Sequence, residues 1–266
     1  MVEQKINEVN RTLYIPLYGK AFVSRRGLFI KDGYAERIWG EVNFPLKGKA
    51  KSKWLAFYMG IRAAVFDRWV KERAEEDPDA VIIHVGAGLD ARRVRCGVKN
   101  VWYDIDFPAV IDERRKHFSD TDDYTMIPSD IRDDGWLSMI TGKDSAIVVM
   151  EGVAMYLNND ERELLMKRLS NRFSQIDLLM DFYTPFGAKM SGKRNPINTV
   201  GVTRVWGIEC PERVGDGVFS EARECEMTPR AYIDELRGFE RFIFKTLYCG
   251  KIAKRIYKIF EYRKLI

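Results

Sequence analysis

Residues 81–106 read VIIHVGAGLDARRVRCGVKNVWYDID, and this stretch determines how the rest of the chain is interpreted. Its first five residues, Val81 to Val85, are apolar and mostly β-branched around one histidine, which is typical of a strand buried on both faces. Gly86-Ala87-Gly88 follows directly, so we expect a turn whose backbone can approach a ligand closely. Asp90 is a suitable N-cap for a helix after this turn.

A second short apolar run, residues 101–103, ends in two acidic residues, Asp104 and Asp106. Strand, glycine turn, helix, strand and acid form the opening βαβ unit of a nucleotide-binding sheet. In such a unit a carboxylate at the end of the second strand binds a ribose diol. The stretch therefore predicts a cofactor-binding site.

Composition places the chain among ordinary globular proteins. Of its 266 residues, 46% are hydrophobic and 31% are charged, and no apolar run approaches the ~18 residues of a spanning helix. The N-terminal residues are too polar for a signal peptide, and four cysteines without a CxxC pair suggest free thiols. We expect a cytoplasmic protein with no membrane partner, and a net charge of +5 does not by itself indicate nucleic acid.

Further short apolar runs at 124–128, 146–150 and 178–182 alternate with helical segments. This alternation predicts an α/β fold with a doubly wound, mostly parallel sheet. Asp160 to Glu163 resembles a capping box at the start of a helix, and 243–248 is expected to be a late strand.

Outside the sheet the chain has three distinctive segments. Residues 1–76 are expected to form an N-terminal helical cap packed on a core at 77–266, and 52–76 has the spacing of an amphipathic helix. Residues 185–227 are rich in glycine and weakly periodic, which suggests an ordered insertion near the active face. The basic tail, 251–266, is expected to be a last helix or strand with a solvated basic face. An amphipathic surface helix is the alternative.

Carboxylates at the predicted strand ends indicate which cofactor fits. In a doubly wound sheet these side chains lie along one edge, where ligands bind. Each uncompensated carboxylate within ~4 Å would oppose a pyrophosphate by ~1–4 kcal/mol. S-adenosylmethionine fits better, because it carries a sulfonium, an ammonium, a ribose diol and only one carboxylate, which a base such as Arg62 could meet. The carboxylates are Asp104, Asp106, Asp130 and Glu151. The alternative interpretation is that these four acids are helix caps or solvated strand ends.

The sequence lacks the residues and motifs of several other kinds of catalytic or binding site. Two histidines, His84 and His117, are too few for most zinc sites or Ser-His triads, so no metal is expected. Neither a G-x-S-x-G nucleophile motif nor a G-K-[ST] phosphate loop is present. Residues 86–91 do satisfy the loose G-x-G-x-x-A dinucleotide pattern, so the glycine turn alone does not decide between cofactors.

Four motifs in order resemble the leucine carboxyl methyltransferase family, and more closely its bacterial branch, which is similar to the tetracenomycin-type polyketide O-methyltransferases. The motifs are VGAGLDARRVR (85–95), YDIDFPAVIDERR (103–115), SDIR (129–132) and VVMEGVAMYL (148–157). The resemblance covers about 55–185 well and also touches 13–21. It implies a class I methyltransferase fold and S-adenosylmethionine as methyl donor.

The resemblance also implies a role for each motif residue. The glycine turn would approach the methionine part of the cofactor, the acids after the second strand would bind the ribose, SDIR would frame the adenine, and M-E-G would lie near the transfer centre. An arginine before the first strand would hold the cofactor carboxylate; at this position the usual R-x-R pattern is broken by Ala64. The implied cofactor-binding residues are Arg62, Gly86, Ala87, Gly88, Asp104, Asp106, Phe107, Asp130, Ile131, Glu151 and Gly152.

The implied reaction is transfer of a methyl group to a carboxylate or hydroxyl of a small, polyketide-like molecule. A carboxylate acceptor needs no general base, whereas an alcohol or phenol does. Tyr18, Tyr156 and Tyr183 are the candidate bases, and the N-terminal helices and 185–227 would select the acceptor. Two alternatives stay open from the residues: an NAD(P)-dependent oxidoreductase, and a non-catalytic S-adenosylmethionine-binding protein.

Overall fold

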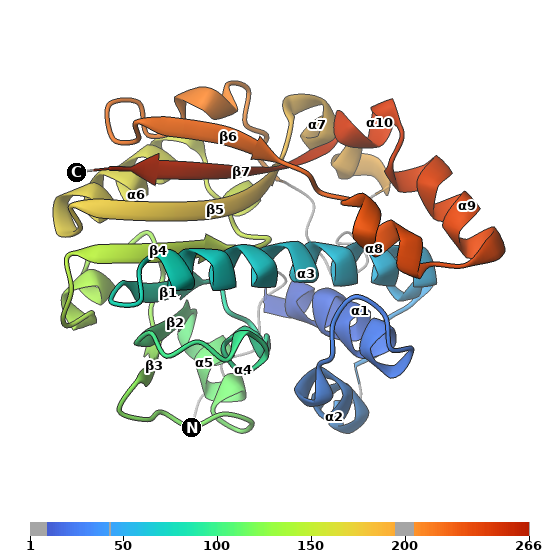
Figure 1. The fold of residues 1–266 in the computed structure, drawn as a ribbon, viewed down its shortest axis with the longest axis horizontal. Coiled ribbons are helices and arrows are strands. Elements are labelled where there is room, and N and C mark those ends of the chain that lie inside the picture. The colour runs from blue at the N-terminus through green and yellow to red at the C-terminus, as the bar shows by residue number, and fades with distance from the viewer. Residues whose placement is uncertain (1–9, 43, 195–204, 266) are drawn as a thin grey trace.

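The computed structural model describes residues 10–42, 44–194 and 205–265. Its centre is a seven-stranded sheet with the order β3-β2-β1-β4-β5-β7-β6 (Figure 1). The strands are β1 (Val81–Val85), β2 (Trp102–Asp106), β3 (Tyr124–Pro128), β4 (Ser145–Met150), β5 (Gln175–Tyr183), β6 (Glu221–Cys225) and β7 (Tyr257–Lys264).

Strands β1 to β5 are parallel, and β7 runs antiparallel to both of its neighbours, β5 and β6. The predicted doubly wound, mostly parallel sheet is therefore confirmed. The strand order reverses between β1 and β4, and in such sheets ligands bind at this reversal, beyond the carboxyl ends of the strands.

The register of the central strands aligns the predicted motifs. Val85 at the end of β1 pairs with Ile105 of β2 on one side and with Met150 of β4 on the other. The three residues that follow these paired positions therefore emerge side by side at one edge of the sheet: Gly86, Asp106 and Glu151.

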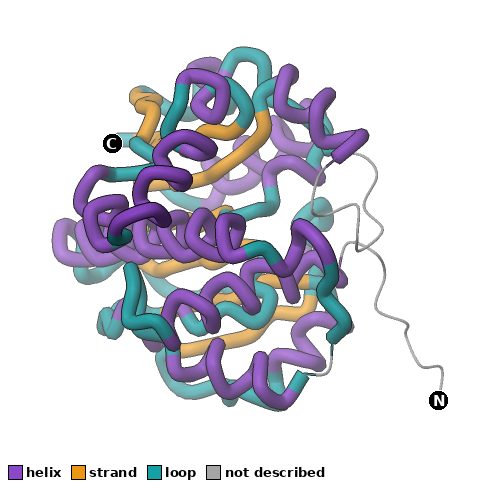
Figure 2. The backbone as a smooth tube through the Cα atoms, turned by 90° about the vertical axis from the view of Figure 1, so that its right-hand side faces the viewer, coloured by secondary structure: helices purple, strands orange, loops and turns teal. Residues whose placement is uncertain are grey.

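Helices lie on both sides of the strands, as Figure 2 shows. The long helix α3, with α8 and α9, covers one face, and α6 covers the other. The helices are α1 (Tyr14–Arg25), α2 (Gly33–Glu41), α3 (Lys53–Glu76), α4 (Arg92–Cys96), α5 (Pro108–Arg114), α6 (Asn159–Arg172), α7 (Pro185–Arg194), α8 (Arg230–Glu235), α9 (Gly238–Tyr248) and α10 (Lys251–Lys254).

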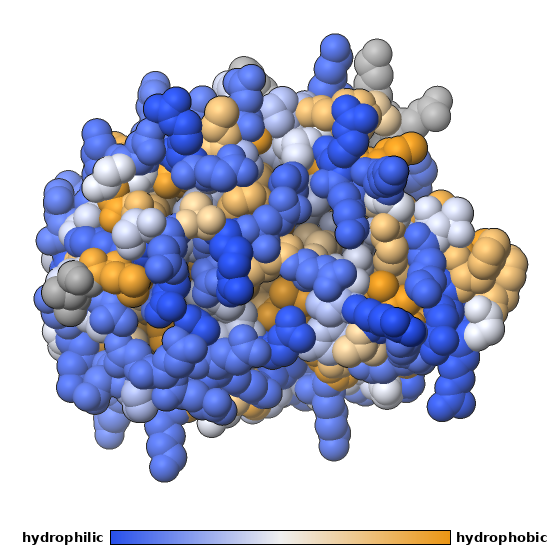
Figure 3. Space-filling model, turned by 45° about the horizontal axis from the view of Figure 1, so that its top comes forward, coloured by the Kyte–Doolittle hydropathy of each residue, from blue (hydrophilic) through white to orange (hydrophobic). Residues whose placement is uncertain are grey.

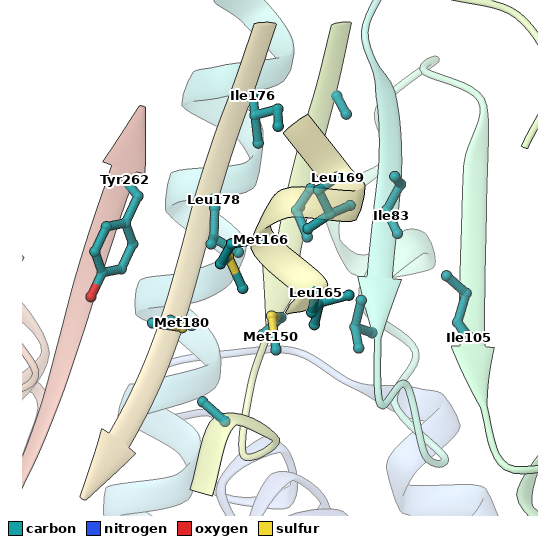
Figure 4. Close-up of a cluster of buried hydrophobic side chains, with 14 of the residues drawn as sticks. Ile83, Ile105, Met150, Leu165, Met166, Leu169, Ile176, Leu178, Met180 and Tyr262 are labelled. Atoms are coloured by element: carbon teal, nitrogen blue, oxygen red, sulfur yellow. The ribbon is translucent and has the colours of Figure 1, made fainter. Parts of the chain in front are cut away.

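The core on the α6 side is built from apolar residues two apart along the strands, because alternate strand residues face the same side. Leu165 and Leu169 of α6 point toward the strand side chains, among them Ile83 and Leu178 (Figure 4). All four side chains are at most 2% exposed. This packing holds the central strands, and hence their loops, in fixed relative positions.

The N-terminal helix α1 lies against α3 at very short range. A Cβ atom added at Gly19 would lie 2.7 Å from Cβ of Met59, and one added at Gly60 would lie 2.7 Å from Cγ2 of Val23. Each helix therefore uses a glycine where the other crosses it. The close crossing brings Lys20 of α1 within 3.0 Å of Asp90, just beyond the β1 turn.

Three local predictions are wrong. Residues 243–248 are the end of helix α9, not a strand. Helix α9 buries Phe244 and exposes Phe242, two residues earlier, whereas residues two apart in a strand face the same side. The capping box of α6 is formed by Asn158 and Glu161, so the helix begins one residue before Asp160. Asp90 is not an N-cap, because α4 begins at Arg92 and the Asp90 side chain forms ion pairs instead.

Two segments whose sequences predict no definite element, 185–227 and the basic tail, each contribute a strand to the sheet. The stretch 185–227 contains helix α7 and the edge strand β6, with residues 195–204 outside the described part. The basic tail forms the short helix α10 and then strand β7, which is inserted between β5 and β6. Four central residues of β7, 259–262, are buried, and its flanking lysines and arginine are partly exposed.

Candidate cofactor and acceptor site

A cavity of about 570 Å³ lies at the carboxyl ends of the central strands, beneath α1 and α3. It brings together most of the residues that the sequence singles out. Of the predicted cofactor-binding residues the lining contains Arg62, Gly86, Ala87, Gly88, Asp106, Phe107, Asp130, Ile131, Glu151 and Gly152.

The turn after β1 requires glycine for two separate reasons. Gly86 has φ of +67°, and a Cβ atom there would lie 2.2 Å from Cγ2 of Val153. Gly88 has φ of +52°, and its backbone N–H donates to Oδ2 of Asp106 at 2.8 Å. The turn therefore brings bare backbone against the cavity and at the same time fixes the acid at the end of β2.

Asp106 is held as an acceptor by backbone alone. Its two oxygens each accept one N–H, from Gly88 and from Phe107, both at 2.8 Å. Burial raises the pKa of this carboxyl to about 6, and the two hydrogen bonds only partly oppose the rise. Each oxygen retains a second lone pair, so the carboxylate can still accept from two neighbouring hydroxyl groups.

Glu151 lies between two buried arginines. Nε of Arg62 donates to its Oε1 at 2.7 Å, and Nη2 of Arg92 pairs with its Oε2. Burial raises the pKa of Glu151, but the two guanidinium groups outweigh this and lower it to about 2. Arg62 also donates through Nη1 to Asp181 Oδ2 at 3.0 Å, so one arginine joins the ends of β4 and β5.

Asp104, which the resemblance implies as a cofactor-binding residue beside Asp106, does not line the cavity. Its side chain is fully buried behind the cavity and accepts hydrogen bonds from Trp102 Nε1 at 2.8 Å and from the Tyr124 hydroxyl at 2.5 Å. Arg114 forms an ion pair with it, and His84 Nδ1 lies 3.1 Å from its Oδ1. With both oxygens engaged, Asp104 is a structural group that supports β2.

Asp130 and Ile131 lie at the rim of the cavity beyond β3. Asp130 accepts from the backbone N–H of Arg132 at 3.0 Å and pairs with the Arg132 side chain. These hydrogen bonds lower the pKa of Asp130. The adjacent Ile131 also lines the cavity, so this end combines an apolar side chain with a carboxylate.

The tyrosine candidates separate into two groups. Tyr18 lies outside the cavity lining, and its hydroxyl donates to the backbone oxygen of Lys51 at 3.2 Å, so its proposed role as a base is wrong. Tyr156 and Tyr183 do line the cavity. Burial raises the pKa of Tyr156 to about 12.

Several lining residues have no signal in the sequence. Tyr58, Tyr248 and Tyr257 come from α3, α9 and β7, and Lys20 comes from α1. Each lies in an ordinary amphipathic or apolar segment, where an aromatic residue is more often part of the core. A motif search alone could not have found them, because only the fold brings these segments to the same cavity.

Comparison with known proteins identifies the family. The model of the leucine carboxyl methyltransferase family matches residues 4–170, more than half of the chain. The tetracenomycin polyketide synthesis O-methyltransferase TcmP of Streptomyces glaucescens is 24% identical over 246 residues, which cover 90% of each chain. The S-adenosyl-L-methionine-dependent methyltransferase dpfgK of Gibberella zeae is 30% identical over 135 residues, 47% of this chain and 45% of the relative.

Solved structures show the same fold. A protein of Thermobifida fusca described as a candidate methyltransferase has a TM-score of 0.59 at 15% identity, over 83% of this chain and 90% of that chain. A DUF574 family protein of Streptomyces avermitilis has a TM-score of 0.56 at 13% identity, over 80% and 86% of the two chains. The sheet is that of the class I methyltransferases. The chain therefore belongs to the leucine carboxyl methyltransferase family, whose methyl donor is S-adenosylmethionine.

Proposed function

We propose that the cavity binds S-adenosylmethionine and that the chain transfers its methyl group to the oxygen of a small, polyketide-like acceptor, with a carboxylate favoured over a hydroxyl. The observation that supports this most directly is the set of side chains held at one edge of the sheet. Asp106 is assigned to the ribose, Asp130 and Ile131 to the adenine, and Arg62 and Glu151 to the methionine part.

The lining suits this cofactor in shape and in charge. Gly86 and Gly88 both line the cavity and carry no side chain, so a ligand can approach their backbone closely. Acids in the lining outnumber bases by one, because Asp90, Asp106, Asp130 and Glu151 face Lys20, Arg62 and Arg132. A sulfonium and an ammonium are favoured by such an environment, whereas a pyrophosphate is opposed.

Nε and Nη1 of Arg62 are held by Glu151 and Asp181, so we assign its remaining nitrogen, Nη2, to the cofactor carboxylate. Fixing two nitrogens of a planar guanidinium orients the third, which is an advantage over a lysine at this position. Lys20, which also lines the cavity, adds a second positive charge within reach of the same region.

S-adenosylmethionine supplies an activated methyl group whose leaving sulfide needs no proton. The chain's own contribution is then to position the acceptor oxygen and to exclude water. Apolar side chains surround the acceptor part of the cavity, and they come from the N-terminal helices and from the late segments: Leu17, Leu55, Met59, Met190, Leu247 and Ile256.

Apart from Asp106, which we assign to the ribose, the following titratable groups of the lining favour an acceptor that is already ionised. A general base works best with a pKa near the working pH. Burial raises the pKa of Tyr156 to about 12 and raises that of Tyr58 and Tyr257 further. Glu151 has its pKa lowered to about 2 and is held by two arginines. A carboxylate acceptor requires none of these groups to remove a proton.

Acceptor selection is assigned to two regions. Residues 1–76 would act as a helical cap through α1 and the start of α3, and 185–227 would contribute through α7. Both regions place side chains in the lining, including Leu17 and Met190. The nicotinamide alternative is overturned by the family membership, and a non-catalytic binding protein is the outcome that an acceptor assay must test.

The test is calorimetric titration with S-adenosylmethionine, S-adenosylhomocysteine and NAD. Wild-type protein is compared with Asp106→Ala and with a control, Asp112→Ala, whose side chain is exposed on the neighbouring helix α5. We expect micromolar binding of the first two ligands, lost in the Asp106 variant and kept in the control. Binding of NAD alone, or unchanged affinity in Asp106→Ala, would overturn the assignment.

The acceptor class is tested with radioactive methyl donor and matched aromatic acceptors that carry either a free carboxylate or only a phenol. Methylation of the carboxylic acids in preference to the phenols supports the proposal. Cofactor binding without transfer to any acceptor of the panel would instead support a non-catalytic protein.

A further inference from the structure

An exposed apolar face lies on α9 and α10. In Figure 3 apolar surface gathers at the right-hand end of the molecule, which is the end where Figure 1 places α9. Single exposed apolar side chains are common on folded proteins, whereas a group of them on one surface often marks an interaction site. The exposed fractions are 71% for Phe239, 66% for Phe242, 53% for Leu247 and 72% for Ile252.

The same segment is strongly basic. Residues 237–255 contain six lysines and arginines and one acid, a charge of +5, which equals the net charge of the whole chain. The acid, Glu240, is already paired with Arg26 at 2.8 Å and with Lys53 at 3.0 Å. We call the four apolar side chains and the exposed cations around them, Arg237, Lys245, Lys251, Lys254 and Arg255, the docking face.

The docking face is continuous with the mouth of the cavity. Leu247 belongs to both, and Met190 of α7, which is 54% exposed, also lines the cavity. The guanidinium of Arg255 lies 5.4 Å from the ring centre of Phe186, which joins α7 to the end of α10. Leu247 therefore links the apolar part of the docking face to the cavity lining.

We infer that the docking face binds the surface of an anionic lipid bilayer. A helix that presents aromatic and aliphatic side chains among lysines and arginines is suited to the bilayer interface, where the apolar groups leave water and the cations meet lipid phosphates. No helix in the described part of the chain is long and apolar enough to cross a membrane.

Charge decides between a lipid surface and a second copy of the chain. Two copies joined through this face would bring their basic segments together, and like charges would oppose the contact. An anionic bilayer instead attracts each cation and also buries Phe239, Phe242 and Ile252. The consequence for the enzyme, which rests on the proposed function, is that an apolar acceptor enters the cavity from the bilayer.

The experiment is co-sedimentation of the full chain with vesicles of phosphatidylcholine alone or of equal parts phosphatidylcholine and phosphatidylglycerol. We expect binding to the anionic vesicles only, weakened as salt shortens the screening length. Phe239→Ser/Phe242→Ser should abolish it. Lys251→Gln/Lys254→Gln should weaken vesicle binding by more than ~10-fold, because each cation near an anionic membrane contributes ~5-fold to the affinity.

Matched controls are Val94→Ser/Leu164→Ser, which remove exposed apolar groups elsewhere, and Lys99→Gln/Lys167→Gln, which remove exposed cations elsewhere. Both should bind vesicles as the wild type does. Equal binding by the docking-face variants, or no binding by any protein, overturns the inference. The inference is also overturned if light scattering shows that the wild type is a dimer and that Phe239→Ser/Phe242→Ser dissociates it. Titration with S-adenosylhomocysteine on the same proteins reports separately on the proposed function.

Discussion

Arg62 and Glu151 are 89 residues apart in the chain, yet Nε of the arginine donates to Oε1 of the glutamate at 2.7 Å. The pair is buried, and each member has a second ionic partner: Asp181 for the arginine and Arg92 for the glutamate. This chain of alternating charges joins α3, α4, β5 and the end of β4 directly beneath the cavity. Stability and ligand binding should therefore depend on the same residues.

Replacement of Arg62 should damage both properties. Arg62→Met leaves Asp181 with one partner fewer in a buried site, so we expect a loss of ~3–5 kcal/mol in the free energy of unfolding. S-adenosylhomocysteine should bind at least ~10-fold more weakly, because the cofactor carboxylate loses its partner. Denaturant titration and calorimetry measure the two effects.

The control is Arg68→Met on the same helix, whose guanidinium is half exposed and lies 3.7 Å from Glu72. It should cost less than ~1 kcal/mol, as exposed ion pairs do. Equal effects of the two substitutions on cofactor affinity would contradict the role of Arg62.

Gly86→Ala should be more harmful than a glycine substitution that is strained only in the backbone. Both Gly86 and Gly97 have positive φ, +67° and +63°, so alanine costs ~1–2 kcal/mol at each. At Gly86 the new methyl also meets Val153 at 2.2 Å, whereas nothing lies within 4 Å at Gly97. In chemical denaturation, Gly86→Ala should have a lower free energy of unfolding than Gly97→Ala. Adding Val153→Ala to the Gly86 variant should restore part of this lost stability.

Asp106 should make stability depend on pH. Burial raises its folded-state pKa to about 6, while its ordinary value is 3.8. Between these values the folded state binds more protons than the unfolded state, so the free energy of unfolding falls as pH rises through this window. Asp106→Asn should remove roughly 1–3 kcal/mol of this dependence, measured as the difference between its pH–stability curve and that of the wild type.

Ligand binding should show the opposite trend. An ionised Asp106 is the better acceptor for ribose hydroxyls, so S-adenosylhomocysteine should bind more weakly as pH falls below about 6. A wild-type affinity that does not change between about pH 5 and pH 8 would contradict the assignment of Asp106 to the ribose.

The pH dependence of turnover should distinguish the acceptor classes. With a carboxylate acceptor no proton is removed, so kcat should be flat from about pH 7 to pH 9, and Tyr156→Phe should stay within ~10-fold of the wild type. With a phenol the rate should rise with pH as the acceptor ionises. A large loss in Tyr156→Phe together with a rising profile for carboxylic acids would show that Tyr156 acts as a base.

The motif residues could be predicted because their signals are local. A buried strand followed by a glycine turn is visible in 81–88, and the acid after the second strand follows from the same βαβ pattern. The prediction of a strand at 243–248 is wrong because its local signal is ambiguous. A short apolar run is compatible with either periodicity, and only packing of Phe244 against the core selects the helix.

The sequence by itself determined the five parallel strands β1 to β5, the glycine turn after β1 and the acids at the strand ends, since periodicity, glycine turns and strand-end acids act over a few residues. Tertiary structure alone decided which carboxylates face the cavity. Asp104 and Asp106 are two residues apart, yet the first is engaged by four buried donors behind the sheet and the second lines the cavity at the strand end. Tyr58, Tyr248 and Tyr257 likewise meet there only because three distant segments pack around one sheet edge, and contacts between distant segments leave no local pattern in a sequence.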